Sequence, residues 1–191
     1  MDYKSYKVSR DLAWEVLIWE NVTTLPVKPM ALCRSMGIEV VYDENIPEGM
    51  DGYCTILNGK SFIALDPKLS RQKRRVTVAH ELGHILLGHV GDFITLYHNG
   101  AHSAQEEEAD VFATILLSPA CVLVGCGVHT PSEIIDLCDI GREEAETRAQ
   151  NVEELYKRNV LFSLPTEKRV YDQFKDFILQ YRQGGETHQD I

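Results

Sequence analysis

Apolar positions alternate with polar ones in one region of the chain, and this spacing is typical of strands that are buried on one face. The alternation predicts a strand over about 38–42. Two apolar runs within about 53–65 flank Asn58-Gly59, the dipeptide most typical of a two-residue hairpin turn. We therefore predict a small antiparallel sheet, made of this hairpin and the strand over 38–42.

Elsewhere the apolar positions recur every three or four residues, which is the spacing of amphipathic helices. Ser9 is the expected N-cap of the first helix, Gly37 the expected end of the second, and Ser70 the expected N-cap of the third. The predicted helices cover about 9–20, 27–36, 70–89, 106–117, a segment from about 134, 141–159 and 170–181. The sequence therefore predicts an α+β fold, in which the small sheet packs with a mainly helical body.

The domain organisation follows from length and from the last predicted helix. A chain of 191 residues is the size of one ordinary domain with an appended tail. We expect residues 1–164 to form a single domain. Residues 165–191 are expected to hold a C-terminal helix and, from Gly184, a disordered tail.

One predicted helix carries the motif His80-Glu81-Leu82-Gly83-His84. Histidines four residues apart lie one turn apart on the same helix face, where both imidazoles can reach one zinc ion at about 2.0–2.1 Å. Glu81 lies on the flank of that face, well placed to take a proton from a water activated by the metal. A random chain of this length shows the five-residue pattern on the order of one per cent of the time. The interpretation that the two histidines are unrelated is therefore the less favoured one.

A third ligand is expected from the next amphipathic helix. Glu106 and Asp110 are four residues apart there and share a face. Glu106 can complete a His-His-Glu site, while Asp110 hydrogen-bonds a ligating imidazole and fixes its tautomer. Glu107 and Glu108 compete for the ligand role, but we prefer Glu106 because it alone has the aspartate one turn further on. Three protein ligands leave a fourth position for water, as catalysis requires.

Polar residues between these two helices are candidates for stabilising a developing negative charge. Tyr97, His98 and His102 lie in the intervening loop, and any of them could donate a hydrogen bond to the oxyanion of a hydrolytic reaction. The alternative, a polar loop at the surface without a role in the reaction, is the stronger of the two interpretations.

Charge argues against nucleic acid as a direct partner. The formal net charge is −10, from 29 acidic and 19 basic residues, whereas phosphate binding requires a basic face. A short basic cluster over 71–75 is better interpreted as the solvated start of a helix.

Three features of the sequence favour a cytoplasmic protein. Continuous apolar runs of about 18 residues are absent from the sequence, so we expect no transmembrane helix. The first residues lack the charged-then-apolar pattern of a signal peptide. Five cysteines at irregular spacing predict reduced, mostly buried thiols rather than disulfides or zinc knuckles.

The two motifs together resemble a known family. His80-Glu81-Leu82-Gly83-His84, followed by Glu106-x-x-Ala109-Asp110-x-Phe112-Ala113-x-x-Leu116-Leu117-x-Pro119, looks like the ImmA/IrrE family of metallo-endopeptidases, which is similar in plan to the gluzincins. The match is specific over about 75–119 and looser through the preceding hairpin and the following 131–159. Two positions depart from the family pattern, which more often has Asn at Asp110 and Met at Ser118; neither is a proposed ligand.

The resemblance implies a function and a partner. Members of the family often cut helix-turn-helix repressors of mobile elements or stress operons once, which relieves repression. Some members carry their own DNA-binding or sensor domain. This chain has room for neither, so we expect the substrate to be a separate protein.

The predicted activity is zinc-dependent peptide hydrolysis. Zinc held by His80, His84 and Glu106 would polarise the scissile carbonyl and activate water, and Glu81 would move the proton from water to the leaving amine. One edge of the sheet could hold an extended peptide by strand addition, although the sequence leaves open which edge is free. The alternative is a binding module that sequesters a regulatory protein without cutting it. A DNA-binding regulator is a third reading, which the acidic charge disfavours.

Overall fold

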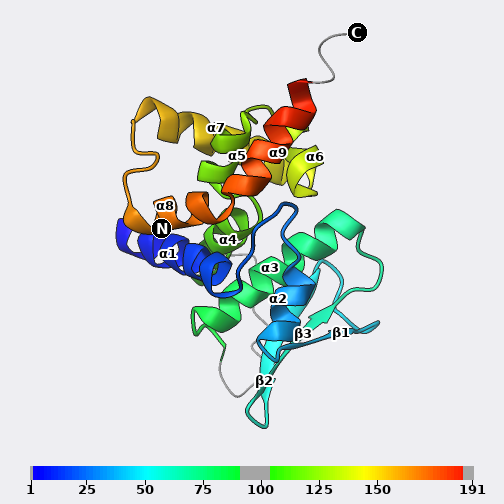
Figure 1. Cartoon of the computed structure of the whole chain (residues 1–191). Coiled ribbons are helices and arrows are strands. Elements are labelled where there is room, and N and C mark those ends of the chain that lie inside the picture. Colours follow the sequence, from blue (N-terminus) through cyan, green and yellow to red (C-terminus); the bar gives the residue numbers. More distant parts are fainter. Residues whose placement is uncertain (1, 91–103, 187–191) are drawn as a thin grey trace. The chain divides into compact units, whose positions relative to one another are not determined.

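The computed structural model of the chain describes residues 2–90 and 104–186 (Figure 1). The chain divides into two compact units. Met1–Leu12 and Lys28–Ala113 form the sheet unit, and Ala13–Val27 and Thr114–Ile191 form the helical unit. Most of α1 (Tyr3–Trp19) and of α4 (Ala104–Leu117) falls in the sheet unit, and the C-terminal end of each belongs to the helical unit.

The sheet unit contains a three-stranded sheet in the order β1-β3-β2. The strands are β1 (Glu39–Tyr42), β2 (Gly52–Leu57) and β3 (Lys60–Leu65), and β2 pairs with β3 in antiparallel fashion. The turn between them is Asn58-Gly59, with φ angles of 52° and 75°. Both angles are positive, as a type I′ turn requires. The predicted hairpin and the α+β class are therefore confirmed.

The strand β1 differs from the prediction because it pairs with β3 in parallel, with Val40 opposite Ile63. The sheet is thus mixed rather than antiparallel. The reason lies in the connections. The chain reverses once between β1 and β2 and again at the hairpin, so β1 and β3 run in the same direction. Alternation of apolar residues identifies a strand but not its partner.

The helix α3 (Arg71–Leu86) packs on β2, β3 and α2 within the sheet unit. Ser70 caps it as predicted, and its side-chain oxygen accepts a hydrogen bond of 3.2 Å from the backbone N–H of Lys73. The buried face runs from Thr77 to Gly83 and includes Val78 and Leu82, both fully buried. This packing holds the histidine-bearing helix against the sheet.

Two predictions about the first helices had different outcomes. The helix α2 (Pro29–Ser35) ends before Gly37, which has a φ angle of 72°, as predicted. The prediction that Ser9 caps the first helix was wrong, because α1 already begins at Tyr3. There the carboxylate of Asp2 accepts a hydrogen bond of 2.8 Å from the backbone N–H of Ser5.

In its described residues, the helical unit consists mainly of five helices: α5 (Ala120–Cys126), α6 (Pro131–Cys138), α7 (Arg142–Lys157), α8 (Pro165–Gln173) and α9 (Lys175–Glu186). Thr130 and Glu133 form a reciprocal capping box at the start of α6, where a helix was predicted. Arg148 is buried on α7 and donates a hydrogen bond of 2.7 Å to the carbonyl oxygen of Ser118.

The C-terminal helix expected over 170–181 is divided in the structure. The helices α8 and α9 meet at Phe174, which is fully buried. Just before it, the amide of Gln173 donates hydrogen bonds of 2.7 and 2.6 Å to the carbonyl oxygens of Leu17 and Val22. The apolar pattern is continuous through this break and so conceals it. The helix α9 continues past Gly184 to Glu186, where the sequence predicted a tail.

Two further expectations concern cysteines and membranes. All five cysteines are buried and free, as expected. Within the described part of the chain, the stretch Ala104–Cys126 is long and apolar enough to cross a bilayer, but 78% of its most apolar part is buried in the structure. Such a helix is weak evidence for a membrane span, because buried core helices meet the same criterion.

Candidate metal centre

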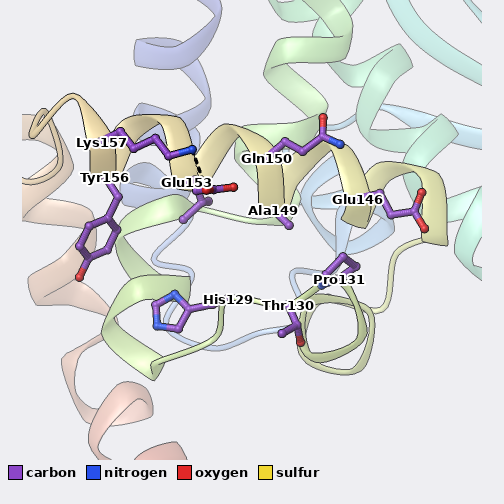
Figure 2. A pocket seen from close by; sticks show the side chains of 10 residues that line it. His129, Thr130, Pro131, Glu146, Ala149, Gln150, Glu153, Tyr156 and Lys157 are labelled. Carbon is purple, nitrogen blue, oxygen red and sulfur yellow. Dashed lines mark ion pairs between the residues drawn. The ribbon is translucent and has the colours of Figure 1, made fainter.

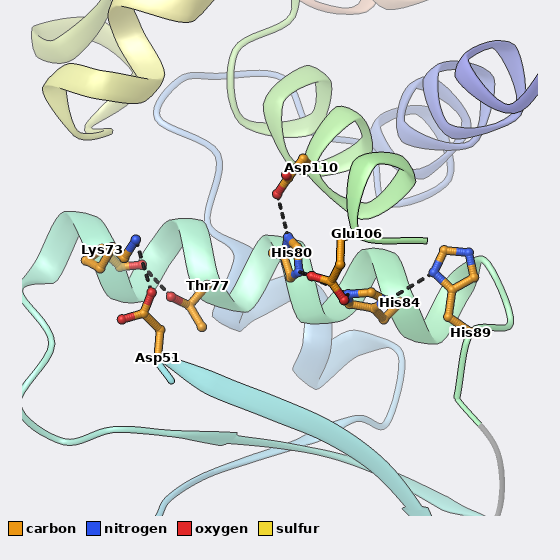
Figure 3. Close-up of polar contacts among 8 residues, drawn as sticks. All are labelled: Asp51, Lys73, Thr77, His80, His84, His89, Glu106 and Asp110. Carbon is orange, nitrogen blue, oxygen red and sulfur yellow. Dashed lines mark hydrogen bonds and ion pairs between the residues drawn. The ribbon is translucent and has the colours of Figure 1, made fainter. Parts of the chain in front are cut away.

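Three side chains of the sheet unit converge on one point, two from α3 and one from the first turn of α4 (Figure 3). The Nε2 atoms of His80 and His84 lie 3.0 Å apart. The carboxylate of Glu106 spans them, with Oε2 3.2 Å from Nε2 of His80 and Oε1 3.4 Å from Nε2 of His84. In residues 2–90 and 104–186, this trio is the group of ligand atoms that could hold a metal ion.

The second nitrogen of the His80 ring fixes its tautomer. Nδ1 of His80 lies 2.8 Å from Oδ1 of Asp110, and a carboxylate can only accept a hydrogen bond. The ring therefore carries a proton on Nδ1 and presents the lone pair of Nε2 to the other ligands. This is the role predicted for Asp110, which remains largely exposed on α4.

The His84 ring is held through a second histidine. Nδ1 of His84 lies 3.0 Å from Nδ1 of His89, and Nε2 of His89 lies 2.9 Å from Oε2 of Glu108. Because Glu108 accepts, His89 carries its proton on Nε2 and accepts from Nδ1–H of His84. Nε2 of His84 then also presents a lone pair. Two lone pairs and one carboxylate facing each other require a cation, so the donor set fits zinc.

The electrostatics of the site agree with this requirement. Burial alone would lower the pKa of His80, but hydrogen bonds to Asp110 and Glu106 and the charge of Glu81 outweigh it. Together they raise the pKa from 6.5 to about 10. Hydrogen bonds from His80 and His84 hold the pKa of Glu106 far below its ordinary value. The raised pKa of His80 and the lowered pKa of Glu106 both indicate that the site favours a positive charge.

Glu81 is buried on the same helix, with 6% of its surface exposed. Its side chain is hydrogen-bonded to the thiol of Cys54 on β2. Burial raises the pKa of Cys54, and the charge of Glu81 and this hydrogen bond raise it further, so the thiol stays protonated and donates.

The glycine of the motif explains how α3 and α4 approach so closely. A Cβ atom on Gly83 would lie 2.9 Å from the ring of Phe112 and 3.3 Å from the Cα atom of Ala109. Any larger residue would therefore push α4 away. Since Glu106 sits one turn before Ala109, Gly83 sets the distance between the carboxylate and the two histidines.

The predicted candidates are thus partly brought together. Glu106 rather than Glu107 or Glu108 faces the two histidines, and Glu108 pairs with His89 instead. The candidate oxyanion donors Tyr97, His98 and His102 lie outside the residues that the structure describes.

Residues 33–124 match the model of the peptidase M78 family, the IrrE N-terminal-like domain. The matched segment contains both helices of the site and all three candidate ligands. Residues 33–124 are an IrrE N-terminal-like domain. This part of the chain is accordingly a metallopeptidase-like domain.

Two other comparisons add little to the IrrE-like assignment. A search of curated proteins found no match. Among solved structures, the chain is similar to a transcriptional regulator of Mycobacterium tuberculosis, with 16% sequence identity and a TM-score of 0.47. The likeness covers 76% of this chain and 46% of that structure, so the chain spans less than half of the length of the protein it resembles.

The contact between His89 and Glu108 was not predicted, because Glu108 was considered only as a rival ligand, although a signal for the position of His89 exists in the IrrE-like segment. Gly88 has a φ angle of 75° and follows the last residue of the helix. The backbone N–H of His89 donates to the carbonyl of His84 at 2.9 Å, and that of Gly88 to Ile85 at 3.2 Å. This pair of bonds is a Schellman motif, which brings the side chain after the glycine against the last turn of the helix.

Outside the IrrE-like domain, the helical unit carries an open groove of about 840 Å³. It lies between His129–Pro131 and the face of α7 from Glu146 to Lys157 (Figure 2). Glu153 and Lys157 form an ion pair of 2.7 Å at its rim. The described residues that line it do not form a metal-ligating group.

Proposed function

We propose that this protein is a zinc-dependent endopeptidase that cleaves a helix-turn-helix repressor in the cytoplasm and so relieves repression. The observation that carries the proposal is the convergence of His80, His84 and Glu106 beside Glu81, within a metallopeptidase-like domain. A structural zinc site usually has four protein ligands and is rich in cysteine. The described ligand group has three members and no cysteine, which supports a catalytic role.

Each residue of the site has a part in this reaction. Zinc held by the two histidines and Glu106 would act as a Lewis acid, polarising the scissile carbonyl and lowering the pKa of water. Glu81 takes the proton of the attacking water and passes it to the leaving amine. The thiol of Cys54 orients Glu81 through its hydrogen bond. Asp110 keeps the lone pair of His80 turned towards the other ligands.

The substrate peptide would pair with the edge of β2. The strand order leaves β1 and β2 at the two edges of the described sheet. Of these, β2 contributes Cys54, which contacts Glu81, so its edge is the one associated with the proposed base. An extended peptide added to this strand would gain main-chain hydrogen bonds and hold its scissile bond in a fixed register.

The charge of the chain supports a basic protein substrate. A repressor that binds DNA presents a basic face. The net charge of −10 on this chain favours its encounter with such a surface and disfavours binding to DNA itself. Repressor and peptidase would then meet through long-range attraction that weakens as salt is added.

The proposal is tested by mixing the zinc-loaded protein with the helix-turn-helix product of a neighbouring gene. The wild-type protein should convert the repressor into two fragments, and Glu81→Gln should abolish cleavage while still binding zinc and repressor. Glu107→Gln, which removes one carboxylate from α4 outside the ligand group, serves as the control and should cleave normally. Equal cleavage by wild type and Glu81→Gln would eliminate Glu81 as the base.

A second outcome would favour a different function. If wild type and Glu81→Gln both bind the repressor tightly and neither cuts it, the protein acts as a module that sequesters a regulator. Mass spectrometry of the repressor distinguishes the two cases, because sequestration leaves its full-length mass unchanged.

A further inference from the structure

The end of α3 is built so that one histidine side chain folds back on another. Gly88 adopts a φ angle of 75°, which permits the chain to reverse after Leu87. The following residue, His89, then donates its backbone N–H to the carbonyl of His84. Their rings meet edge to face, with centroids 5.2 Å apart. The contact is therefore fixed by backbone hydrogen bonds as well as by the side chains.

The far side of the His89 ring is anchored on α4. Its Nε2 lies 2.9 Å from Oε2 of Glu108, and both side chains are mostly shielded from solvent. The distances join Glu108, His89 and His84 into a continuous chain of hydrogen bonds (Figure 3 shows the contact between His84 and His89). Its direction is set at one end, because the carboxylate of Glu108 can only accept.

We propose that His89 and Glu108 are positioning residues for the metal ligand His84, which they hold as the Nδ1–H tautomer with its Nε2 lone pair aimed at the metal. The inference rests on the proposed metal site. It makes the two histidine ligands equivalent, since an acid holds each of them: Asp110 holds His80 directly, and Glu108 holds His84 through His89. Partners of this kind typically contribute about 10- to 100-fold to metal affinity.

The hydrogen-bonded path from the acid to His84 is longer than the path to His80 for a geometric reason. Asp110 is one turn after Glu106 on α4, and it reaches His80 directly. Glu108 is only two residues after Glu106, and it reaches His84 through the intervening imidazole of His89. The contact between His89 and Glu108 thus links the end of α3 to the first turns of α4, the two segments that carry the ligands.

The test measures zinc affinity by competition with a chelating dye, independently of peptidase activity. His89→Leu removes both hydrogen bonds and should weaken binding by about 10- to 100-fold. His89→Asn keeps an oxygen near the position of Nδ1 and should recover part of this loss. Glu108→Gln removes the charge that fixes the tautomer and should weaken binding by a smaller factor. The matched control Glu107→Gln should stay within about twofold of wild type.

A spectroscopic readout separates positioning from loss of fold. The cobalt-loaded protein should show altered ligand-field absorption in His89→Leu and near-normal absorption in His89→Asn, because rotation of His84 changes the ligand geometry. Circular dichroism of the metal-free proteins establishes whether each variant folds. If His89→Leu does not fold, the comparison of Glu108→Gln with Glu107→Gln decides the question.

The possible failures are distinguishable. If wild-type protein does not bind zinc, or if His84→Ala binds it as well as wild type does, the proposed metal site is wrong and the inference falls with it. If wild type binds zinc, His84→Ala loses it, and all His89 and Glu108 variants bind as wild type does, the metal site stands and the positioning role is overturned.

Discussion

In the metal-free protein, His80 binds a proton tightly, because Asp110, Glu106 and Glu81 together raise its pKa to about 10. At neutral pH, an incoming metal must displace this proton. Glu106 adds no proton, since its pKa is held low. Zinc affinity should therefore rise about tenfold per pH unit between about pH 6 and pH 8. Calorimetry in two buffers of different ionisation enthalpy should detect the release of about one proton, and no release would contradict the assignment.

The stability of the metal-free protein should depend on pH in the opposite direction, because the fold favours the proton on His80. The pKa of His80 is raised in the fold above the ordinary value of 6.5, so protonated His80 contributes its full stabilisation below pH 6.5. The contribution is lost as pH rises towards 10. We expect the free energy of unfolding of the metal-free protein, measured by urea titration, to fall over this window. A steady rise would show that His80 is not the proton carrier.

Cys54 tests whether the hydrogen bond to Glu81 matters for the proposed reaction. Cys54→Ala removes the donor, and a hydrogen bond to a charged group is worth about 1.5–3 kcal/mol. We expect kcat for repressor cleavage to fall about tenfold or more, while zinc affinity stays within about twofold. Cys54→Ser restores a donor and should recover most of the rate. Full activity of Cys54→Ala would show that the thiol only fills space.

The residues of the site were predictable to different degrees. His80 and His84 follow from helix geometry alone, because four residues of spacing fix their relation. Glu106 could be chosen over its neighbours because Asp110 shares its face. Cys54 lies on another element, and no local spacing connects it to Glu81. His89 was accessible in principle, but only by treating Gly88 as the C-terminal residue of a helix-ending motif.

Among the elements, α3 and α4 depend most on a single position, Gly83. In Gly83→Ala, the new methyl group would lie 2.9 Å from Phe112 and 3.3 Å from the backbone of Ala109, which cannot easily give way. Crowding of this kind costs about 1–3 kcal/mol, against a gain in helix propensity of about 1 kcal/mol. We expect a net loss of stability in urea and weaker zinc binding, because Glu106 moves away with α4.

Gly184→Ala is the matched control for this prediction. Gly184 also lies in a helix, α9, but a Cβ atom added there meets no atom within 4 Å. The substitution should therefore be neutral or slightly stabilising and should leave zinc binding unchanged. Equal behaviour of the two alanine variants would show that close approach at Gly83 is unimportant for the site.

The elements themselves were predicted best where a local rule decides them. Ser70 and Asn58-Gly59 act within a few residues, and each is used as expected. The Thr130 capping box is equally local, and it starts a helix that was predicted there. The parallel pairing of β1 depends on chain direction over more than twenty residues. The early start of α1 depends on Asp2, which precedes the first clear apolar stripe. The break at Phe174 is invisible because its side chain continues the apolar pattern on both sides.

At the scale of the whole molecule, the candidate ligands all belong to one of the two units. His80, His84 and Glu106 lie in Lys28–Ala113, together with Asp110, His89 and Glu108. A metal that binds the folded form stabilises whatever must stay folded to present its ligands. Stabilisation by zinc should therefore be concentrated in the sheet unit and should not extend equally to α6 and α7.

Hydrogen exchange followed by mass spectrometry can measure this distribution. Addition of saturating zinc should slow exchange in peptides from α3 and the first turns of α4, because their local opening separates the ligands. Peptides from α6 and α7 should change little, and His84→Ala should abolish the effect in α3. Equal protection of α7 would mean that the two units open together as one cooperative structure.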